Sequence, residues 1–506
     1  MRFPLVLALL TMAVIPVWSQ DTAPYRVLQG AGPAGFGGGE LPAAEVADHI
    51  TPEQRARIKA QIEFNRERLR REGVLMRSSV ASTPTFGWPL KLAPGLDDPG
   101  YHGVSNFVDQ DPAFPGALLD YDCLDRTYDI DGYNHAGIDF FTWPWGWLKM
   151  DEETVWVVAA APGQIVYRED GNFDRNCGFG ASDWNAVYVE HADGSVTWYG
   201  HLKTDSLTEK QVGDFVEEGE YLGVVGSSGN STGPHLHMET YDSGGNLIEP
   251  YEGPCNGFNS TTWWKDQRPY YDTALNRVTT GYAPPVIPVC PDPELPHASV
   301  TFAAGPEVYF TMYYRDQLQG QVSDFTLRRP DGSLYSNWNH SSPEPHYTGS
   351  YWYWWFDIPV GEQQGTWSFT AEFEGQTIVR EFSIGGGTAA LSGRVPQYRV
   401  HGTQLTVTRG EGSTVDLAWG ASCAEGDSDF VVYEGAVGDF TSHAPVLCST
   451  AGAPVATVTP AGGSRYFLIA PGNGAVEGSR GRDSSGVARP AGAGSCFPEN
   501  AAPSCP

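Results

Sequence analysis

The sequence predicts a mainly β protein, with a compact antiparallel β domain followed by two β-sandwich-like modules. Glycine and proline are abundant, at 60 and 38 of 506 residues, and aromatic residues make up 12% of the chain. Segments with helical periodicity are scarce, while short alternating stretches bounded by turn residues recur throughout. This combination is typical of β proteins with many turns. The length allows two to four domains.

Residues 1–19 are predicted to be a secretory signal peptide. One early positive charge precedes an apolar run that prolines interrupt, and Val17 and Ser19 suit the −3 and −1 positions of a cleavage site. No other stretch is apolar enough to cross a bilayer, so we expect no membrane span. The predicted location is therefore secreted, periplasmic or at the cell surface. The net charge of −30 argues against nucleic acid and anionic membrane partners.

Residues 20–83 are predicted to contain a linker and then a basic helix. The glycine-rich composition of residues 20–50 is typical of a flexible linker. Thr51 is a suitable N-cap, Pro52 suits the first turn, Gln54 completes a capping box, and Gly73 can end the helix.

Eight of the 31 basic residues lie between Arg55 and Arg77. They could form an ordinary solvated face of the helix. Alternatively, the helix could be a prosegment that docks on the acidic body of the protein and covers an active cleft. The sequence leaves both interpretations open.

Residues 84–283 are predicted to form the compact β domain. Two strands surround a Pro-Gly turn within residues 154–167, and residues 185–199 form a hairpin around Asp193-Gly194. Residues 212–226 again alternate short strands with glycine turns. No helical signal of note occurs here.

Two further β units follow. Residues 290–385 have the strand spacing of an immunoglobulin-like sandwich, and residues 390–500 weakly resemble a fibronectin type III-like module. The aromatic run Tyr351–Phe356 could be a carbohydrate-stacking platform, although alternating aromatics more often fill a sandwich core. We expect these modules to tether or space the first domain.

Export makes the eight cysteines candidates for disulfide bonds. Pairing of nearest neighbours is the simplest expectation, although the sequence cannot determine connectivity. It would join Cys123 to Cys177, Cys255 to Cys290, Cys423 to Cys448, and Cys496 to Cys505.

Histidines and one aspartate suggest a metal site. His235 and His237 are separated by Leu236, so on a strand both imidazoles face one side while Leu236 faces the core. His135 and Asp139 are four residues apart and on a strand would also share a face. Nitrogen and carboxylate ligands suit zinc, and three protein ligands leave a fourth position for water. Either His235 or His237 would be the third protein ligand, beside His135 and Asp139.

Three motifs in this order resemble the lysostaphin-type (LytM-like) zinc metallopeptidases. They are His-x-Gly-x-Asp from His135, Tyr-Gly-His-Leu around His201, and the glycine-rich stretch that ends in His235-Leu-His237. The resemblance covers residues 84–255 and implies a small antiparallel β fold with a narrow groove. It implies that His135, Asp139 and His237 bind Zn²⁺, and that His201 and His235 are catalytic.

Three departures from the family pattern occur. Met238 stands where phenylalanine is common before Glu239. Tyr133 and Asn134 precede the first histidine, where the family often has arginine. An insertion over residues 173–183 carries Cys177 and is expected to reshape one wall of the groove, which affects substrate preference.

The resemblance implies a secreted zinc endopeptidase that hydrolyses peptide bonds by metal-activated water. Peptidoglycan peptides or cross-bridges are the expected substrate, and a glycine-rich polypeptide is the next candidate. A non-catalytic wall-binding or amidase-activating protein is the alternative from another class, and an adhesin is a third. The protein is expected to be a monomer.

Overall fold

The structure is a computed structural model that describes the chain in several ranges. The predicted signal peptide and Cys423 and Cys505 lie outside them. The described residues are 25–41, 47–75, 82–94, 96, 98–130, 132–180, 183–290, 292–385, 392–395, 404–410, 412–422, 424, 427–473, 476–481, 489, 492 and 494–499.

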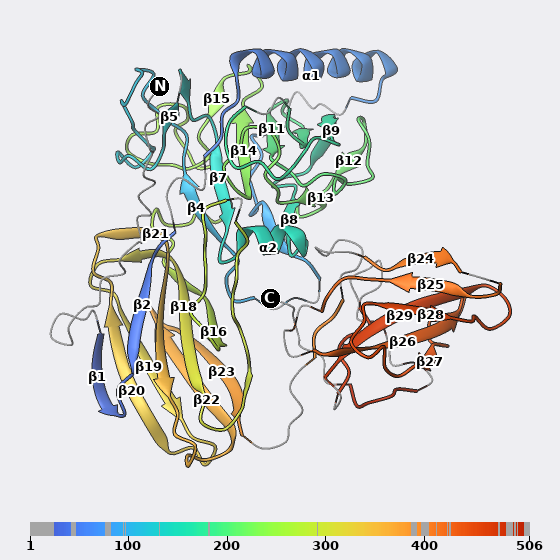
Figure 1. Cartoon of the computed structure of the whole chain (residues 1–506). Coiled ribbons are helices and arrows are strands. Elements are labelled where there is room, and N and C mark those ends of the chain that lie inside the picture. The colour runs from blue at the N-terminus through green and yellow to red at the C-terminus, as the bar shows by residue number, and fades with distance from the viewer. Residues whose placement is uncertain are drawn as a thin grey trace, which may run out of the picture.

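The protein is mainly β, as predicted, and its first β unit is built on an eight-stranded antiparallel sheet (Figure 1). The predicted hairpin around Asp193-Gly194 is confirmed, because the two strands beside it pair. The strands, in spatial order, are β12 (Phe215–Val216), β9 (Gly163–Glu169), β10 (Ala186–Glu190), β11 (Val196–Gly200), β14 (His235–Tyr241), β7 (Ile138–Thr142) and β4 (His102–Asn106), with β15 (Leu247–Ile248) beside β14.

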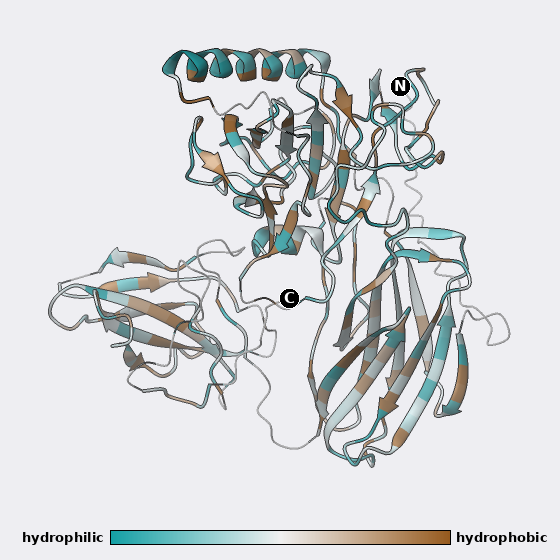
Figure 2. Cartoon of the chain, turned by 180° about the vertical axis from the view of Figure 1, so that it is seen from behind, coloured by the Kyte–Doolittle hydropathy of each residue, from teal (hydrophilic) through white to brown (hydrophobic). Residues whose placement is uncertain are grey.

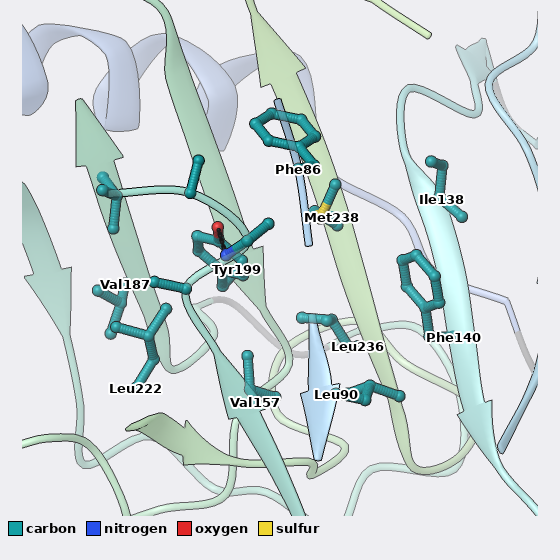
Figure 3. Close-up of a cluster of buried hydrophobic side chains, with 14 of the residues drawn as sticks. Phe86, Leu90, Ile138, Phe140, Val157, Val187, Tyr199, Leu222, Leu236 and Met238 are labelled. Atoms are coloured by element: carbon teal, nitrogen blue, oxygen red, sulfur yellow. Dashed lines mark hydrogen bonds between the residues drawn. The ribbon is translucent and has the colours of Figure 1, made fainter. Parts of the chain in front are cut away.

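A three-stranded sheet packs on one face of this sheet and encloses the hydrophobic core. Figure 3 shows Leu236 and Met238 of β14 and Phe140 of β7 in that core, together with side chains of the smaller sheet. The strands of this smaller sheet are β3 (Leu90–Leu92), β8 (Val155–Val158) and β13 (Tyr221–Val224).

Two smaller features complete the unit. The strand β5 (Asp129–Ile130) pairs with β6 (Tyr133–Asn134), and α2 (Gly146–Asp151) is a short helix that the sequence did not predict.

The helix α1 (Pro52–Glu72) covers the other face of the eight-stranded sheet. It begins and ends as predicted: the Thr51 side chain accepts from the Gln54 amide, and Gly73 closes the helix in the left-handed conformation. Ile58, Ile62 and Leu69 are buried against the sheet. Hydrophilic residues dominate the rest of the helix in Figure 2. The helix is therefore docked along one side rather than solvated on all sides.

The second unit is a two-sheet β-sandwich around a core rich in aromatic residues. One sheet contains, in spatial order, β1 (Tyr25–Gly30), β20 (Leu334–Ser341), β19 (Val322–Arg328), β22 (Gly365–Phe373), β23 (Gln376–Ile384) and β17 (Thr301–Phe302). The other contains β16 (Ala274–Gly281), β18 (Glu307–Leu318), β21 (His346–Asp357) and β2 (Gly35–Glu40).

Two predicted boundaries differ from this architecture. Residues 20–50 were predicted to be a flexible linker, but β1 and β2 add one strand to each sheet of the sandwich. The strand β16 lies within the predicted first domain, yet it pairs with β18 of the sandwich. Gly35 and Gly37 of β2 are needed because aromatic rings lie over them: a Cβ at Gly35 would sit 2.2 Å from the Trp355 ring.

The aromatic run on β21 divides between the two faces of its sheet. Trp352, Trp354 and Phe356 are buried in the sandwich core, so the core interpretation holds for alternate residues. Tyr353 and Trp355 point to the opposite face and are half-buried. A carbohydrate-stacking role for them stays a prediction.

The third unit contains two three-stranded sheets around a smaller core. Figure 1 places this unit apart from the sandwich, on the far side of α2. Its assignment as fibronectin type III-like, and that of the sandwich as immunoglobulin-like, stay predictions. The strands are β24 (Thr406–Arg409), β25 (Val415–Ala418) and β28 (Val455–Val458) in one sheet, and β27 (Ala444–Leu447), β26 (Asp429–Ala436) and β29 (Arg465–Gly472) in the other.

The predicted nearest-neighbour pairing of cysteines is wrong. The disulfides join Cys123 to Cys255, Cys177 to Cys290, and Cys448 to Cys496, with separations of 132, 113 and 48 residues. Strand pairing brings together segments that are distant in sequence, so proximity along the chain does not decide the partner.

Within the described residues, none of the helices combines the length and the apolar character that a membrane crossing requires.

Candidate metal centre and active site

All five predicted site residues lie together at one end of three neighbouring strands. His237 on β14 is paired with Asp139 on β7 and with Gly200 on β11. His201 directly follows Gly200, and His235 lies two residues before His237 on β14. The strand register therefore places three histidines and one carboxylate within a few ångströms of one another.

The alternation of side chains along β14 separates the core from the site. Leu236 and Met238 point into the hydrophobic core, as predicted for Leu236. His237 and Glu239 therefore point to the opposite face. The helix α1 covers that same face, so it lies over the site rather than over the back of the domain.

Three ligand-type atoms converge on one point. Asp139 Oδ1 lies 2.9 Å from His237 Nδ1 and 3.1 Å from His135 Nε2, and these two nitrogens are 3.3 Å apart. His135 follows β6 rather than sharing a strand with Asp139, contrary to the expectation. The chain passes so close to the His237 ring that a Cβ at Gly137 would lie 2.6 Å from it, which explains the glycine of the motif.

The other polar atoms of these side chains have protein partners that fix their orientation. His135 Nδ1 lies 2.8 Å from the carbonyl oxygen of Phe107, and His237 Nε2 lies 3.1 Å from Glu239 Oε1. Each of these nitrogens therefore carries the proton, which leaves the opposite nitrogen free to bind a metal. Asn106 Nδ2 donates to Asp139 Oδ2 at 3.0 Å, so Oδ1 is directed at the centre.

His201 and His235 flank the same centre. Their Nδ1 atoms face the carbonyl oxygens of Ser228 and Gly233, at 2.6 and 2.8 Å, so both Nε2 atoms are directed into the site. Their ring centroids are 4.5 Å apart. His235 Nε2 is buried without a hydrogen-bond partner among the described residues, 3.8 Å from Asp139 Oδ1.

Asp48 is a site residue that the sequence analysis missed. It lies just before α1, is fully buried, and places Oδ2 2.8 Å from His237 Nδ1 and 3.0 Å from His201 Nε2. The Tyr128 hydroxyl donates to its other oxygen. A lone aspartate before a helix cap has no spacing relationship to the motifs. The only sequence signal for Asp48 was its position just before a helix that could dock on the body of the protein.

The carboxylates give the site a strong preference for positive charge. Burial by itself would raise the pKa of Asp139, but the adjacent imidazole of His135 outweighs it, and the pKa lies below its usual value. Burial would lower the pKa of His237, whereas Asp48 and Asp139 hold it well above its usual value. For His235, burial and the nearby His201 lower the pKa to about 4, so this ring is neutral at pH 7.

The donor set fits a bound metal ion. Ligands about 2.1 Å from a tetrahedral zinc are separated by roughly 3.4 Å, close to the observed spacing of the three converging atoms. Among the described residues, two groups of candidate ligands meet the spacing for a metal ion, Asp48 with His135 and His237, and Asp48 with His201 and His235, and neither includes Asp139. His135, Asp139 and His237 stay the predicted ligands, because three of their atoms converge within 3.3 Å of one another.

The site is closed to solvent. His135, Asp139, His235 and His237 are fully buried, and His201 is 1% exposed. Trp184 covers part of it, with its ring edge on His201 at a centroid distance of 4.8 Å. A molecule as large as a peptide cannot reach these atoms in this arrangement of the chain.

Described residues of the predicted insertion pair with the glycine-rich stretch next to the site, while their effect on a groove wall stays a prediction. The amide of Gly178 donates to the Ser231 carbonyl at 2.8 Å, and the amide of Asn176 donates to the Ser227 carbonyl at 3.1 Å. The glycine-rich stretch 226–233 thus pairs with the insertion, and the disulfide at Cys177 anchors the insertion to the segment after β16.

Comparison with known proteins identifies the domain that carries this site. Residues 133–250 match the model of Peptidase family M23. The DD-carboxypeptidase/endopeptidase Mpg of Neisseria meningitidis serogroup B is 42% identical over 88 residues, which are 17% of this chain and 17% of that protein. The glycyl-glycine endopeptidase ALE-1 of Staphylococcus capitis is 34% identical over 110 residues, which are 22% of this chain and 25% of that one.

The chain thus spans a quarter or less of the length of these curated relatives. Among solved structures, the catalytic domain of lysostaphin from Staphylococcus simulans aligns with 24% identity and a TM-score of 0.20, covering 29% of this chain and 89% of that one. The segment that matches the family model contains the three motifs and all five predicted site residues. Residues 133–250 of this chain are therefore a domain of peptidase family M23, the lysostaphin-type family that the motifs indicated.

Proposed function

We propose that this chain is a secreted, zinc-dependent endopeptidase that cleaves peptides of the bacterial cell wall. The observation that carries the proposal is the convergence of His135 Nε2, Asp139 Oδ1 and His237 Nδ1, with two further imidazoles beside them. Three protein ligands and an open position are typical of catalytic rather than structural zinc. A bound zinc would polarise a carbonyl and activate water.

The histidines next to the ligands supply proton transfer in this proposal. His235 donates its Nδ1 proton to the Gly233 carbonyl, so its Nε2 carries a lone pair that can accept a proton. His201 directs its Nε2 at the same space from the neighbouring strand. One ring can take a proton from the attacking water while the other stabilises the developing oxyanion or protonates the leaving amine.

The substrate class is supported by the relatives. Their names describe a DD-carboxypeptidase/endopeptidase, a glycyl-glycine endopeptidase and a peptidoglycan DD-endopeptidase. Peptidoglycan peptides or cross-bridges are therefore the first substrates to test, followed by a glycine-rich polypeptide. The roles of the five site residues, secretion and the monomeric state belong to the same proposal.

The test is mass analysis of fragments released from purified peptidoglycan. It is run on the wild type and on Asp48→Ala, because Asp48 occupies the site. His237→Ala removes a ligand and is expected to lower bound zinc and to abolish release in both backgrounds. His297→Asn, a substitution outside the site at a half-buried histidine with a φ of 48°, is the matched control and is expected to change neither.

Fragments released equally by the protein with and without His237 would contradict a zinc peptidase. If zinc binds but no form releases fragments, a wall-binding or activating role would replace the enzymatic one.

A further inference from the structure

Two of the three departures from the family pattern meet at one side chain, the imidazole of His49. The centroid of its ring lies 5.5 Å from that of Tyr133, which precedes the first ligand motif, and 5.9 Å from that of Phe179 in the insertion. Both distances are typical of rings in contact. Tyr133 and Phe179, which we call the aromatic pair, are thus far apart in the sequence but contact the same ring.

Tyr133 belongs to the immediate surroundings of the metal centre. It lies on β6, and the centroid of its ring is 6.4 Å from that of His135, one of the predicted ligands. Its side chain is buried, and its hydroxyl oxygen accepts from the Ala136 amide at 3.4 Å. A group held against this ring therefore lies close to the metal.

Phe179 is an exposed side chain on a firmly held backbone. The side chain is 40% exposed. The amide of Gly180 donates to Asn230 Oδ1 at 2.8 Å, and the amide of Gly178 is bonded to the same glycine-rich stretch. The other end of the Asn230 amide donates to the His49 carbonyl at 2.9 Å. Asn230 therefore fixes the spacing between the Phe179 backbone and whatever backbone lies at the position of residue 49.

Residues of basic type contact the aromatic pair in this structure. His49 lies against both rings, and the guanidinium carbon of Arg55 lies 5.8 Å from the centroid of Tyr133. The face of an aromatic ring attracts a cation at such a distance, because the ring quadrupole is negative there. The contacts of Tyr133 are therefore those of a ring that accepts positive charge.

Carboxylates near Tyr133 add to this preference. Burial raises the pKa of the Tyr133 hydroxyl well above its usual value, and the charges of Asp48, Glu239 and Asp139 raise it further. Groups that disfavour a phenolate favour a cation at the same place. The net charge of −30 for the whole chain has the same sign.

We propose that the aromatic pair is a specificity subsite for a positively charged side chain of the substrate, the amino group of a lysine or another diamino acid near the cleaved bond. The inference rests on the proposed function. The substrate side chain takes the place that His49 has in this structure, with its ammonium group against the two ring faces. A plain glycine bridge offers no side chain to either ring, so this chain is expected to prefer the diamino acid.

The first test measures the binding of labelled peptides Gly-Gly-X-Gly-Gly by fluorescence anisotropy, where X is lysine, Nε-acetyl-lysine or norleucine. The full chain is loaded with Zn²⁺ and carries Asp48→Ala and His49→Ala, which free the site and the aromatic pair, and His201→Ala, which prevents cleavage. The lysine peptide is expected to bind about three- to thirtyfold more tightly than the other two. No difference between the peptides, with or without detectable binding, or tighter binding of norleucine would overturn the proposal.

Phe179→Leu tests the assignment to the ring, since leucine keeps an apolar side chain at an exposed position. We expect it to remove most of the preference for lysine. Phe173→Leu is the matched control, because Phe173 is an exposed phenylalanine of the same insertion outside the aromatic pair. It is expected to keep the preference; equal losses in both variants would overturn the assignment. Tyr133→Phe retains the ring and is expected to keep the preference as well.

Cleavage separates this inference from the proposed function. Peptidoglycan whose free amino groups have been acetylated is compared with untreated peptidoglycan, on the chain with Asp48→Ala and His49→Ala. Release of fragments is expected to be about three- to thirtyfold slower from the acetylated wall, and Phe179→Leu is expected to abolish most of that difference. Preferential binding of the lysine peptide without cleavage by any form supports the subsite and overturns the peptidase. Equal cleavage of both walls overturns the subsite and leaves the peptidase standing.

Discussion

The sandwich that ends at β23 shares a buried apolar cluster with the M23 domain, whereas an ion pair links that domain to the C-terminal unit. Phe141, Trp143 and Trp145 of the first domain pack with Tyr313 of the sandwich. Trp143 Nε1 also donates to the Tyr314 carbonyl at 2.9 Å. By contrast, Arg394 and Glu152 are 3.3 Å apart at the start of the C-terminal unit.

This difference teaches that the two β units have different roles. The strands β1 and β2, which precede Asp48 in the chain, belong to the sandwich. The sandwich therefore helps to hold in place the segment that carries Asp48. Among the described residues, the apolar clusters of the C-terminal unit contain residues of that unit alone. We therefore expect the sandwich to be required for the stability of the M23 domain and the C-terminal unit to be dispensable for it.

Of the variants that test this comparison, Trp143→Ala should lower the free energy of unfolding most. It opens a cavity between the two domains and removes the bond to Tyr314, so we expect a loss of about 3–5 kcal/mol in the free energy of unfolding. Urea denaturation followed by fluorescence measures it. Phe173→Ala, at a side chain that is 67% exposed, is the control and is expected to change stability by less than about 0.5 kcal/mol. Similar losses in both variants would contradict the shared core.

Gly38→Ala tests whether β2 belongs to the sandwich. Gly38 has a φ of 138°, and a Cβ there would lie 2.2 Å from the Tyr351 carbonyl oxygen. We expect a loss of about 1–3 kcal/mol, the usual range for a strained backbone position. Gly39→Ala is the matched control, because a Cβ there meets no atom within 4 Å. If residues 35–40 were a linker, the two variants would unfold at the same denaturant concentration.

Ending the chain at Gly385 should have the smallest effect. It removes the C-terminal unit and the ion pair between Arg394 and Glu152, and partly exposed pairs contribute about 1 kcal/mol or less. The thermal midpoint and the rate of fragment release by Asp48→Ala are expected to stay close to those of the full chain. A large fall in the thermal midpoint would show that the C-terminal unit, like the sandwich, is required for the stability of the M23 domain.

The candidate site could be predicted from the sequence because its residues belong to three short motifs that resemble those of a known family. His235 and His237 alternate with Leu236 along one strand, and Gly137 allows the chain to approach the His237 ring. Such constraints act over a few residues and leave a readable spacing. The position of His135 outside β7 was missed because the motif spacing alone does not show where a strand begins.

The role of residues 25–40 could not be predicted for a different reason. A run of glycines has no side-chain pattern, so it is typical of a linker when read alone. Its strand character depends on Trp355 and the other rings of β21, more than 300 residues later, which fill the space above the glycine backbone. The disulfides depend on distant pairing in the same way, since two of the three within the described residues span more than 100 residues.

The sequence by itself determined the β class and the basic helix with both its ends, and its three motifs, through their resemblance to a known family, indicated the five residues that cluster in the candidate metal centre. The first two features arise from turn chemistry and capping, which are local. Only the tertiary structure decided that Asp48 joins those five. Its carboxylate reaches His201 across 153 positions of the chain, through a docked helix and a bridge to Ser231. No local pattern encodes such a contact, because it exists only when separate elements pack together.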